Sequence, residues 1–142
     1  MDHRHITAAG ILFFSMNTKR RLFLLRSATK HRDTWGLVGG KLEGDETLLE
    51  GLIRECQEEV GSVPNILKVI PVEQFTSDDE RFVFHTFICV INDEFAPVLN
   101  HEHHGYCWLD KGKWPKPLHP GLWSTIGIES VKRKITQVED AL

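Results

Sequence analysis

Apolar and β-branched residues near the N-terminus predict the first strands of the chain. Residues 5–14, HITAAGILFF, and residues 21–27, RLFLLRS, have the composition of strands. The polar segment SMNTKR between them predicts a hairpin turn, because asparagine is a frequent turn residue. Residues 34–40, TWGLVGG, predict a short strand that runs into paired glycines.

The apolar period changes to that of a helix over residues 47–60. Apolar side chains recur there at helical spacing, at Leu48, Leu49, Leu52, Ile53, Cys56 and Val60. Thr47 followed three places later by Glu50 fits a capping box, and Gly61 fits a helix C-terminus. We therefore predict one helix in this segment.

Two further strands are predicted after this helix. Residues 66–75 and 81–91 are rich in apolar residues and flank the polar turn TSDDE. In the second of them, two-residue alternation places one set of side chains on a single face: Phe82, Phe84, Ile88 and Val90.

The last third of the chain predicts mostly irregular structure, followed by a helix. Residues 92–105 predict a loop, 106–109 a short strand, and 110–121 an irregular connection rich in Pro, Gly and Lys. In residues 128–142 the stripe of an amphipathic helix is formed by Ile128, Val131, Ile135, Val138 and Leu142. The element order predicts an α/β (α+β) fold, a mixed sheet packed by helices, in a single domain over residues 1–142.

Composition and charge narrow the class of protein. The 142 residues are 41% hydrophobic and 26% charged, as in one ordinary globular domain. We expect no membrane association and a cytoplasmic location, because no secretory leader pattern and no apolar run of about 20 residues is present. A formal net charge of −3 argues against a nucleic-acid polymer as partner. Cys56, Cys89 and Cys107 lack disulfide or zinc-cage spacing and are expected to be core residues.

Two polar segments have both a functional and an ordinary interpretation. His101, His103 and His104 carry imidazoles that bind zinc well, but exposed loop histidines are the simpler interpretation. The segment KGKWPKP, residues 111–117, is the one stretch that hints at a basic track for a nucleic-acid polymer. We expect it to be an exposed loop.

Carboxylates gather on one face of the predicted helix. At about 100° per residue, the apolar arc is centred near Leu49 and Cys56. Glu55, Glu58 and Glu59 fall within about 100° of one another beside it, and such like-charge pairs cost a few tenths of a kcal/mol each. A divalent cation would reverse that sign, because magnesium takes oxygen ligands and shares its sphere with substrate phosphates. The alternative is a solvated acidic helix face.

Residues 40–62 resemble the signature of the Nudix (MutT-like) hydrolases: Gly, five residues, Glu, seven residues, then Arg-Glu-apolar-x-Glu-Glu-x-Gly-apolar. The matching residues are Gly40, Glu46, Arg54, Glu55, Cys56, Glu58, Glu59 and Gly61. Ser62 replaces the final apolar residue and Val38 stands where many members have proline, and neither change removes a ligand. The resemblance implies an α/β/α sandwich whose catalytic loop and helix carry the motif.

The resemblance also implies metal-dependent hydrolysis of a phosphoanhydride bond, with Mg²⁺ or Mn²⁺ as cofactor. It makes Glu55, Glu58 and Glu59 catalytic metal ligands, joined by the carbonyl of Gly39. Arg54 belongs to the same catalytic group and, as a bidentate partner of a carboxylate, also supports the motif. Gly40, Glu46, Arg54 and Gly61 are the residues expected to support it.

A further glutamate from a distant loop is expected as metal ligand or general base. Glu102 is the candidate, because it precedes the short strand ending near Trp108 by the interval found in similar triphosphate hydrolases, and Glu94 is the fallback. An aromatic side chain near the phosphate site is expected to stack on the base, although an aromatic residue in a strand is more often a core residue. These candidates are Trp35, Phe75, Phe84 and Trp108.

The substrate implied by the resemblance is a small nucleotide. The default is a nucleoside or deoxynucleoside triphosphate, cleaved to a monophosphate and pyrophosphate by a monomer or homodimer. ADP-ribose, nucleotide sugars and dinucleoside polyphosphates are the alternatives. Two alternative functions of other classes are a non-catalytic nucleotide-sensing module and an enzyme that trims the 5′ triphosphate of RNA.

Overall fold

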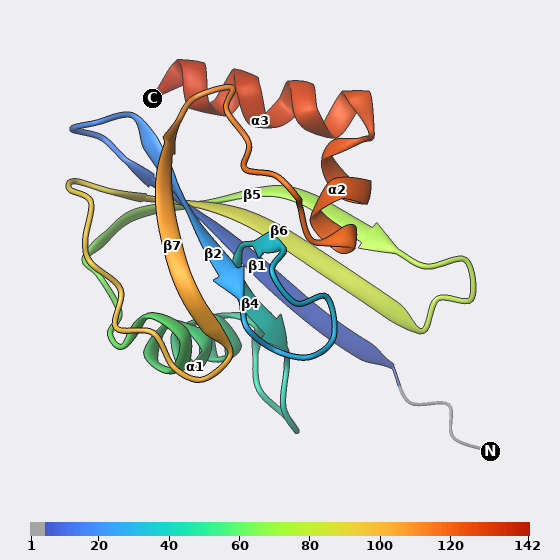
Figure 1. Cartoon of the computed structure of the whole chain (residues 1–142). Coiled ribbons are helices and arrows are strands. Elements are labelled where there is room, and N and C mark those ends of the chain that lie inside the picture. Colours follow the sequence, from blue (N-terminus) through green and yellow to red (C-terminus); the bar gives the residue numbers. More distant parts are fainter. Residues whose placement is uncertain (1–4) are drawn as a thin grey trace.

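Seven strands of residues 5–142, the part of the chain that this computed structural model describes, form one mixed sheet (Figure 1). They are β1 Ile6–Ser15, β2 Arg20–Arg26, β3 Trp35–Gly36, β4 Val38–Lys41, β5 Ile66–Thr76, β6 Phe82–Ile91 and β7 His103–Asp110. The order is β3-β2-β1-β6-β5, with β4 paired to β1 and β7 paired to β2. β1 and β6 run parallel, and the other pairs are antiparallel.

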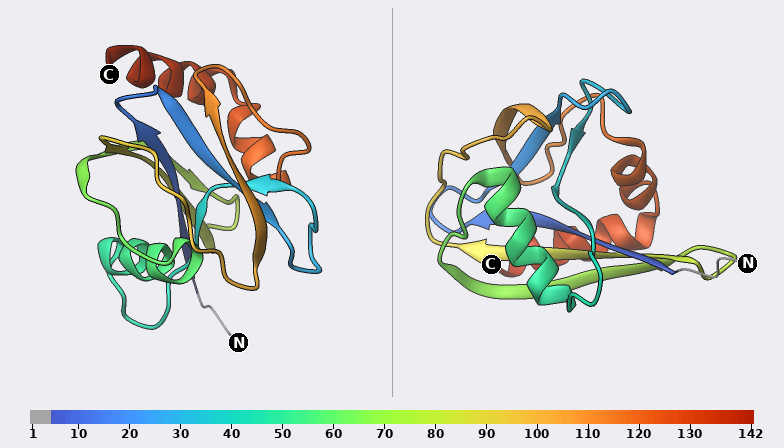
Figure 2. Two further views of the ribbon diagram at one scale, coloured as in Figure 1. Left: turned by 60° about the vertical axis from the view of Figure 1, so that its left-hand side comes forward. Right: turned by 90° about the horizontal axis from the view of Figure 1, so that it is seen from below.

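Helices cover both faces of this sheet (Figures 1 and 2). α1, Leu48–Val60, lies on one face, and α2, Pro120–Ile126, and α3, Glu129–Ala141, lie on the other. The hairpin of β5 and β6 projects beyond the helices, which leaves its end uncovered (Figure 2). The expected fold class, a mixed sheet flanked by helices, is confirmed.

The central strand β1 is buried on both faces because helices lie above and below it. Ile11 and Phe13 pack with α1, whereas Leu12 and Phe14 pack with α2 and α3. Each such fully buried side chain contributes about 1.5–3 kcal/mol relative to an exposed one. Cys56 and Cys89 are buried in the first of these clusters and form no disulfide, as expected.

Both predicted ends of α1 are confirmed. The Thr47 hydroxyl accepts a hydrogen bond from the Glu50 backbone N–H at 3.2 Å, and the Glu50 carboxylate accepts one from the Thr47 N–H at 2.9 Å. Gly61 closes the helix with φ of 87°, a left-handed conformation that glycine adopts without strain. Two local signals in the sequence therefore fix the position of the helix along the chain.

The buried face of α1 differs from the expected one. Leu49 and Ile53 are 60% and 40% exposed, and the helix instead buries Glu55, Cys56 and Glu59 along with other residues. The expected apolar arc centred near Leu49 and Cys56 is therefore only partly right: Cys56 is buried, as expected, but Leu49 is not. The helix is rotated so that two of its carboxylates face the glycines of β4, which lies against it.

Two strands and one helix also differ from expectation. The short strand expected over residues 34–40 is split into β3 and β4 at Leu37. β7 begins at His103, earlier than the expected strand, because it pairs along nearly all of β2. α2 was not expected, and it begins at Pro120 after His119, whose ring accepts a hydrogen bond from the Gly121 N–H.

A buried ion pair ties β2 to the C-terminal helix. Arg21 and Glu139 are 0% and 3% exposed, and the Arg21 guanidinium lies 3.2 Å from a Glu139 carboxylate oxygen. The same guanidinium lies over the rings of Phe23 and Trp114. Trp114 is therefore half-buried against Arg21, whereas Lys111, Lys113 and Lys116 of the same segment are exposed, as expected. Within residues 5–142, no helix is long and apolar enough to cross a lipid bilayer.

Candidate functional site

The paired glycines of β4 let the backbone approach both β1 and α1. A Cβ at Gly39 would lie 2.0 Å from the Ala9 carbonyl oxygen, and a Cβ at Gly40 would lie 2.7 Å from a carboxylate oxygen of Glu55. Any larger residue would therefore push the strand away from the helix. The close approach allows the Gly39 backbone N–H to donate a hydrogen bond of 2.7 Å to Glu59.

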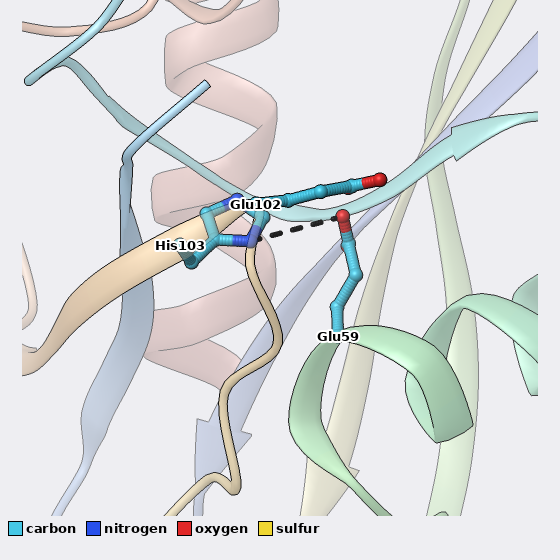
Figure 3. A group of neighbouring side chains, drawn as sticks. All are labelled: Glu59, Glu102 and His103. Carbon is cyan, nitrogen blue, oxygen red and sulfur yellow. Dashed lines mark ion pairs between the residues drawn. The ribbon is translucent and has the colours of Figure 1, made fainter.

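Three side chains with metal-binding atoms meet beside the paired glycines of β4 (Figure 3). Glu59 from the last turn of α1, Glu102 from the preceding loop of β7 and His103 from its first position each offer one ligand atom within 4.8 Å of the others. The Glu59 and His103 side chains are only 4% and 3% exposed, and their nearest ring nitrogen and carboxylate oxygen lie 3.9 Å apart. We call these three residues the acidic cluster.

The three carboxylates expected on one helix face do not converge at one point. Glu59 is in the acidic cluster, whereas Glu58 turns to Arg54, which donates a hydrogen bond to it at 3.1 Å. Glu55 is buried between Gly40 and Arg54, and burial raises the pKa of its carboxyl while Arg54 opposes that rise. The roles of Glu55 and Glu58 as metal ligands stay predictions.

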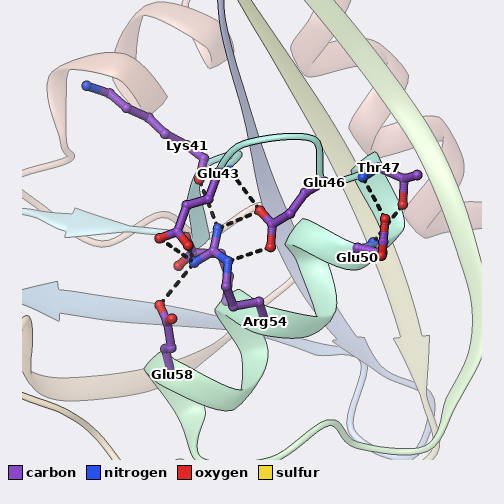
Figure 4. A network of polar contacts seen from close by, with 8 residues as sticks. Lys41, Glu43, Glu46, Thr47, Glu50, Arg54 and Glu58 are labelled. Atoms are coloured by element: carbon purple, nitrogen blue, oxygen red, sulfur yellow. Dashed lines mark hydrogen bonds and ion pairs between the residues drawn. The ribbon is translucent and has the colours of Figure 1, made fainter.

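Arg54 is the centre of a polar network that holds the loop between β4 and α1, residues 42–47, against α1 (Figure 4). Its guanidinium makes two hydrogen bonds to the Glu46 carboxylate, at 2.7 and 3.1 Å, and donates a third to the Lys41 carbonyl at 3.0 Å. Hydrogen bonding from Arg54 lowers the pKa of Glu46. This bidentate geometry suits the supporting role expected for the pair.

The distal glutamate candidates lie in different surroundings. Glu102 is in the acidic cluster, within reach of Glu59. Glu94 is held instead by Arg20, whose Nε and Nη2 donate hydrogen bonds of 2.6 and 2.5 Å to its two carboxylate oxygens. The structure therefore brings Glu102, and not Glu94, to the end of α1.

His103 is the site residue that the sequence did not reveal. The expectation of exposed loop histidines holds for His101; His104 is exposed but lies in β7, and His103 is buried. Its inward position results from the extension of β7 back to residue 103, where it pairs with Arg26. His104 instead points outward, where its ring lies 2.9 Å from the Asp33 carboxylate.

Burial controls the charge of the acidic cluster. It raises the pKa of Glu59 to about 9, although the Gly39 N–H opposes that rise, and it lowers the pKa of His103 to about 4. Both side chains are therefore neutral in the metal-free protein near neutral pH. A cation that binds to Glu59 near neutral pH would therefore have to displace the proton of its carboxyl.

The metal-free protein is expected to lose stability as the pH rises from 6.5 to 9. Glu59 ionises near 4.5 in the unfolded chain but near 9 in the fold, so a rising pH favours unfolding across that interval. His103 acts in the opposite direction only below 6.5, its value in the unfolded chain, so above 6.5 it no longer offsets the effect of Glu59. The free energy of unfolding should fall by about 3 kcal/mol at most over this window.

Urea denaturation in the presence of a chelator, repeated across this pH range, measures that fall. Glu59→Gln is the control, because its amide does not ionise and its stability should depend less on pH. Parallel pH profiles for the two proteins would show that Glu59 does not hold an unusual proton.

A cleft of about 830 Å³ opens beside the acidic cluster. It lies between the sheet face of β1, β5 and β6 and the helices α2 and α3, and Glu59 and His103 form part of its wall. Among the aromatic candidates, Phe75 and Phe84 line it, and the ring of Phe82 stacks near that of Phe84 at 6.3 Å. Trp108 is a core residue instead, buried beside Phe95.

Comparisons with known proteins identify the family of the domain and proteins of similar fold. The family model described as NUDIX domain matches residues 4–126. A dihydroneopterin triphosphate diphosphatase of Haemophilus influenzae is 28% identical over 128 residues, which cover 80% of this chain and 79% of that protein.

Two solved structures have a similar fold. A MutT NUDIX hydrolase from Burkholderia pseudomallei superposes with a TM-score of 0.69 at 18% identity, covering 91% of this chain and 97% of that one. An Ap4A hydrolase from C. elegans, in a binary complex, gives a TM-score of 0.67 at 19% identity, covering 95% and 99%. At these identities the likeness concerns the fold alone.

Proposed function

The chain belongs to the Nudix hydrolase family, and we propose that it cleaves a nucleoside triphosphate, or a triphosphate of a similar planar heterocycle, to a monophosphate and pyrophosphate. The observation that carries this proposal is the junction of two features. An acidic cluster able to hold a divalent cation forms one wall of a cleft whose other walls are largely apolar and aromatic. Such a cleft accommodates a heterocycle while its phosphates reach the cluster.

The residues of the acidic cluster fit a divalent cation. Two carboxylates and an imidazole present oxygen and nitrogen donors within 4.8 Å, and the cleft gives an ion a path to them. Glu59 and Glu102 would hold the ion, with Glu55, Glu58 and the Gly39 carbonyl as further ligands. A bound divalent cation supplies charge neutralisation for the phosphates and a water of lowered pKa for attack on phosphorus.

The chain itself supplies positioning. Arg54 and Glu46 hold the glycine loop against α1, so that the phosphates can approach the backbone at Gly39 and Gly40. Glu102 is also the candidate general base, because it lies beside Glu59, which forms part of the wall of the cleft. The apolar walls exclude water from the bound heterocycle.

Phe84→Ala is expected to raise KM about tenfold with little change in kcat. Stacking on an aromatic ring contributes about 1–3 kcal/mol per base, and binding that is equal in the ground and transition states appears in KM. Steady-state kinetics on the preferred substrate measure the effect. Trp123→Ala is the matched control, since Trp123 is 65% exposed and lies outside the lining of the cleft. An unchanged KM would remove Phe84 from the binding surface.

The experiment that tests the proposed function is product analysis over a panel of substrates. Nucleoside and deoxynucleoside triphosphates, ADP-ribose, nucleotide sugars and dinucleoside polyphosphates are incubated with Mg²⁺, with Mn²⁺ and with chelator. We expect triphosphates to yield monophosphate and pyrophosphate only when metal is present. Preferential cleavage of another class would redirect the substrate, and binding of nucleotides without any cleavage would favour a sensing module.

A further inference from the structure

The Nδ1 atom of His103 is buried without a hydrogen-bond partner in the described part of the chain. Buried polar atoms nearly always have such a partner, because an unsatisfied one loses its hydration without compensation. The other side-chain atoms in this condition belong to Arg21 and Glu139, and those two face each other as an ion pair. His103 therefore needs an explanation of its own.

The position of Nδ1 fits a shared ligand better than a hydrogen bond. It faces a Glu59 carboxylate oxygen at 3.9 Å, which is too long for a direct hydrogen bond. Two ligands that each lie about 2.1 Å from one ion are separated by about 3–4 Å. Glu102 completes a set of three donors within 4.8 Å, all at the wall of the cleft or next to it (Figure 3).

The backbone at this point is shaped to direct His103 inward. The pairing of β2 with β7 shifts register between Leu25 and Arg26, so that Leu25 pairs with Gly105 and Arg26 pairs with His103. His104 is the extra residue of this bulge, and it points away to Asp33. Bulges commonly re-aim side chains next to functional sites.

We infer that His103 supplies a nitrogen ligand to the divalent ion held by Glu59 and Glu102, and that this site consequently prefers Mn²⁺ to Mg²⁺. The inference rests on the proposed function, because it names a ligand of the same metal site. Imidazole suits transition metals, whereas Mg²⁺ is bound best by oxygen donors and water. A mixed oxygen and nitrogen site therefore discriminates between two ions that an all-carboxylate site accepts alike.

Pulsed electron paramagnetic resonance of the Mn²⁺-loaded protein tests the ligand directly. In a buffer without amines, the wild-type protein is expected to show coupling of a directly bound ¹⁴N nucleus to manganese. The coupling should change to that of ¹⁵N in protein grown with ¹⁵N-labelled histidine. It should be lost in His103→Ala and kept in His104→Ala, the matched control for the neighbouring exposed histidine.

Metal titrations by calorimetry test the preference. His103→Ala is expected to lower the affinity for Mn²⁺ by at least about 10- to 100-fold, the loss that removal of a residue behind the metal ligands already causes, and to change that for Mg²⁺ by much less. His103→Gln gives the same comparison with a bulkier side chain if the alanine variant folds poorly, and the wild-type spectrum needs no variant at all.

The outcomes separate this inference from the proposed function. Bound Mn²⁺ without nitrogen coupling, or coupling that persists in His103→Ala, would overturn the inference while hydrolysis of triphosphates continued to support the function. Equal losses of Mn²⁺ and Mg²⁺ affinity in His103→Ala would overturn the preference. Failure of both ions to bind, together with absence of hydrolysis, would reject the metal site itself and the function with it.

Discussion

Glu59→Gln is expected to lower kcat by at least about 10³-fold while leaving the fold intact. Metal ligation stabilises the charge of a phosphoryl-transfer transition state by several kcal/mol, and about 4 kcal/mol corresponds to 10³-fold in rate. The amide has the shape of the carboxyl and keeps an oxygen to accept the hydrogen bond from Gly39, so packing is preserved. What the substitution removes is the negative charge that the carboxyl would carry with a cation bound.

The measurement is kcat on the preferred triphosphate at saturating metal, with the thermal midpoint of each protein recorded in chelator. Glu129→Gln provides the control, because Glu129 is an exposed carboxylate at the start of α3 and should give wild-type rates. A Glu59→Gln protein that keeps a tenth of the wild-type kcat would remove Glu59 from the catalytic centre.

Arg21→Met is expected to have the largest effect on stability, about 3–5 kcal/mol. The Glu139 carboxyl is buried, and burial already raises its pKa while Arg21 opposes that rise. Loss of the guanidinium leaves this carboxyl without its partner in a site that water does not reach. It also removes the cation that lies 4.9 Å from the centre of the Trp114 ring.

A double-mutant cycle assigns this effect to the pair. Arg21→Met combined with Glu139→Leu should recover part of the loss, because two apolar side chains of similar size need no partners in a buried site. Lys111→Met is the control: Lys111 pairs with Asp140 at 3.4 Å on the surface, and its loss should change the free energy of unfolding by less than about 1 kcal/mol. A loss under about 1 kcal/mol for Arg21→Met in urea denaturation would contradict the prediction.

The sequence predicted those parts of the fold that depend on local interactions. The capping box of α1 joins residues three positions apart, and Gly61 closes the same helix, so both ends could be located without the rest of the molecule. The alternation in β6 was likewise sufficient, since Ile88 and Val90 lie in the α2 and α3 cluster and Phe84 lines the cleft on that face.

Features that depend on distant partners could not be predicted in this way. Glu139 lies next to the apolar stripe of α3, and only the presence of Arg21 on β2 explains why it is buried. His103 is buried because of a register shift between β2 and β7, which no local pattern encodes. Leu49 matched the helical period but is exposed, because α1 turns its carboxylates toward β4.

For the motif, the sequence identified the glutamates but did not show which of them would be buried in the acidic cluster and which would lie at the surface. Glu58 and Glu59 are adjacent in sequence, yet one carboxylate turns to Arg54 on the surface and the other is buried beside Glu102. Arg54 holds Glu58 away from the acidic cluster. In the same way, Arg20 holds Glu94, the other candidate for the distal glutamate. Helical spacing alone does not contain that information.

The parallel pairing of β1 with β6 also determines when the site can form during synthesis. The first strand emerges from the ribosome before α1, but its parallel partner follows much later, and Glu102 and His103 follow later still. A nascent chain that ends soon after α1 carries every glutamate of the motif and lacks both the strand that completes the centre of the sheet and the second half of the acidic cluster. The proposed metal site would therefore be complete only late in translation, and pairings of such long range are slow to form.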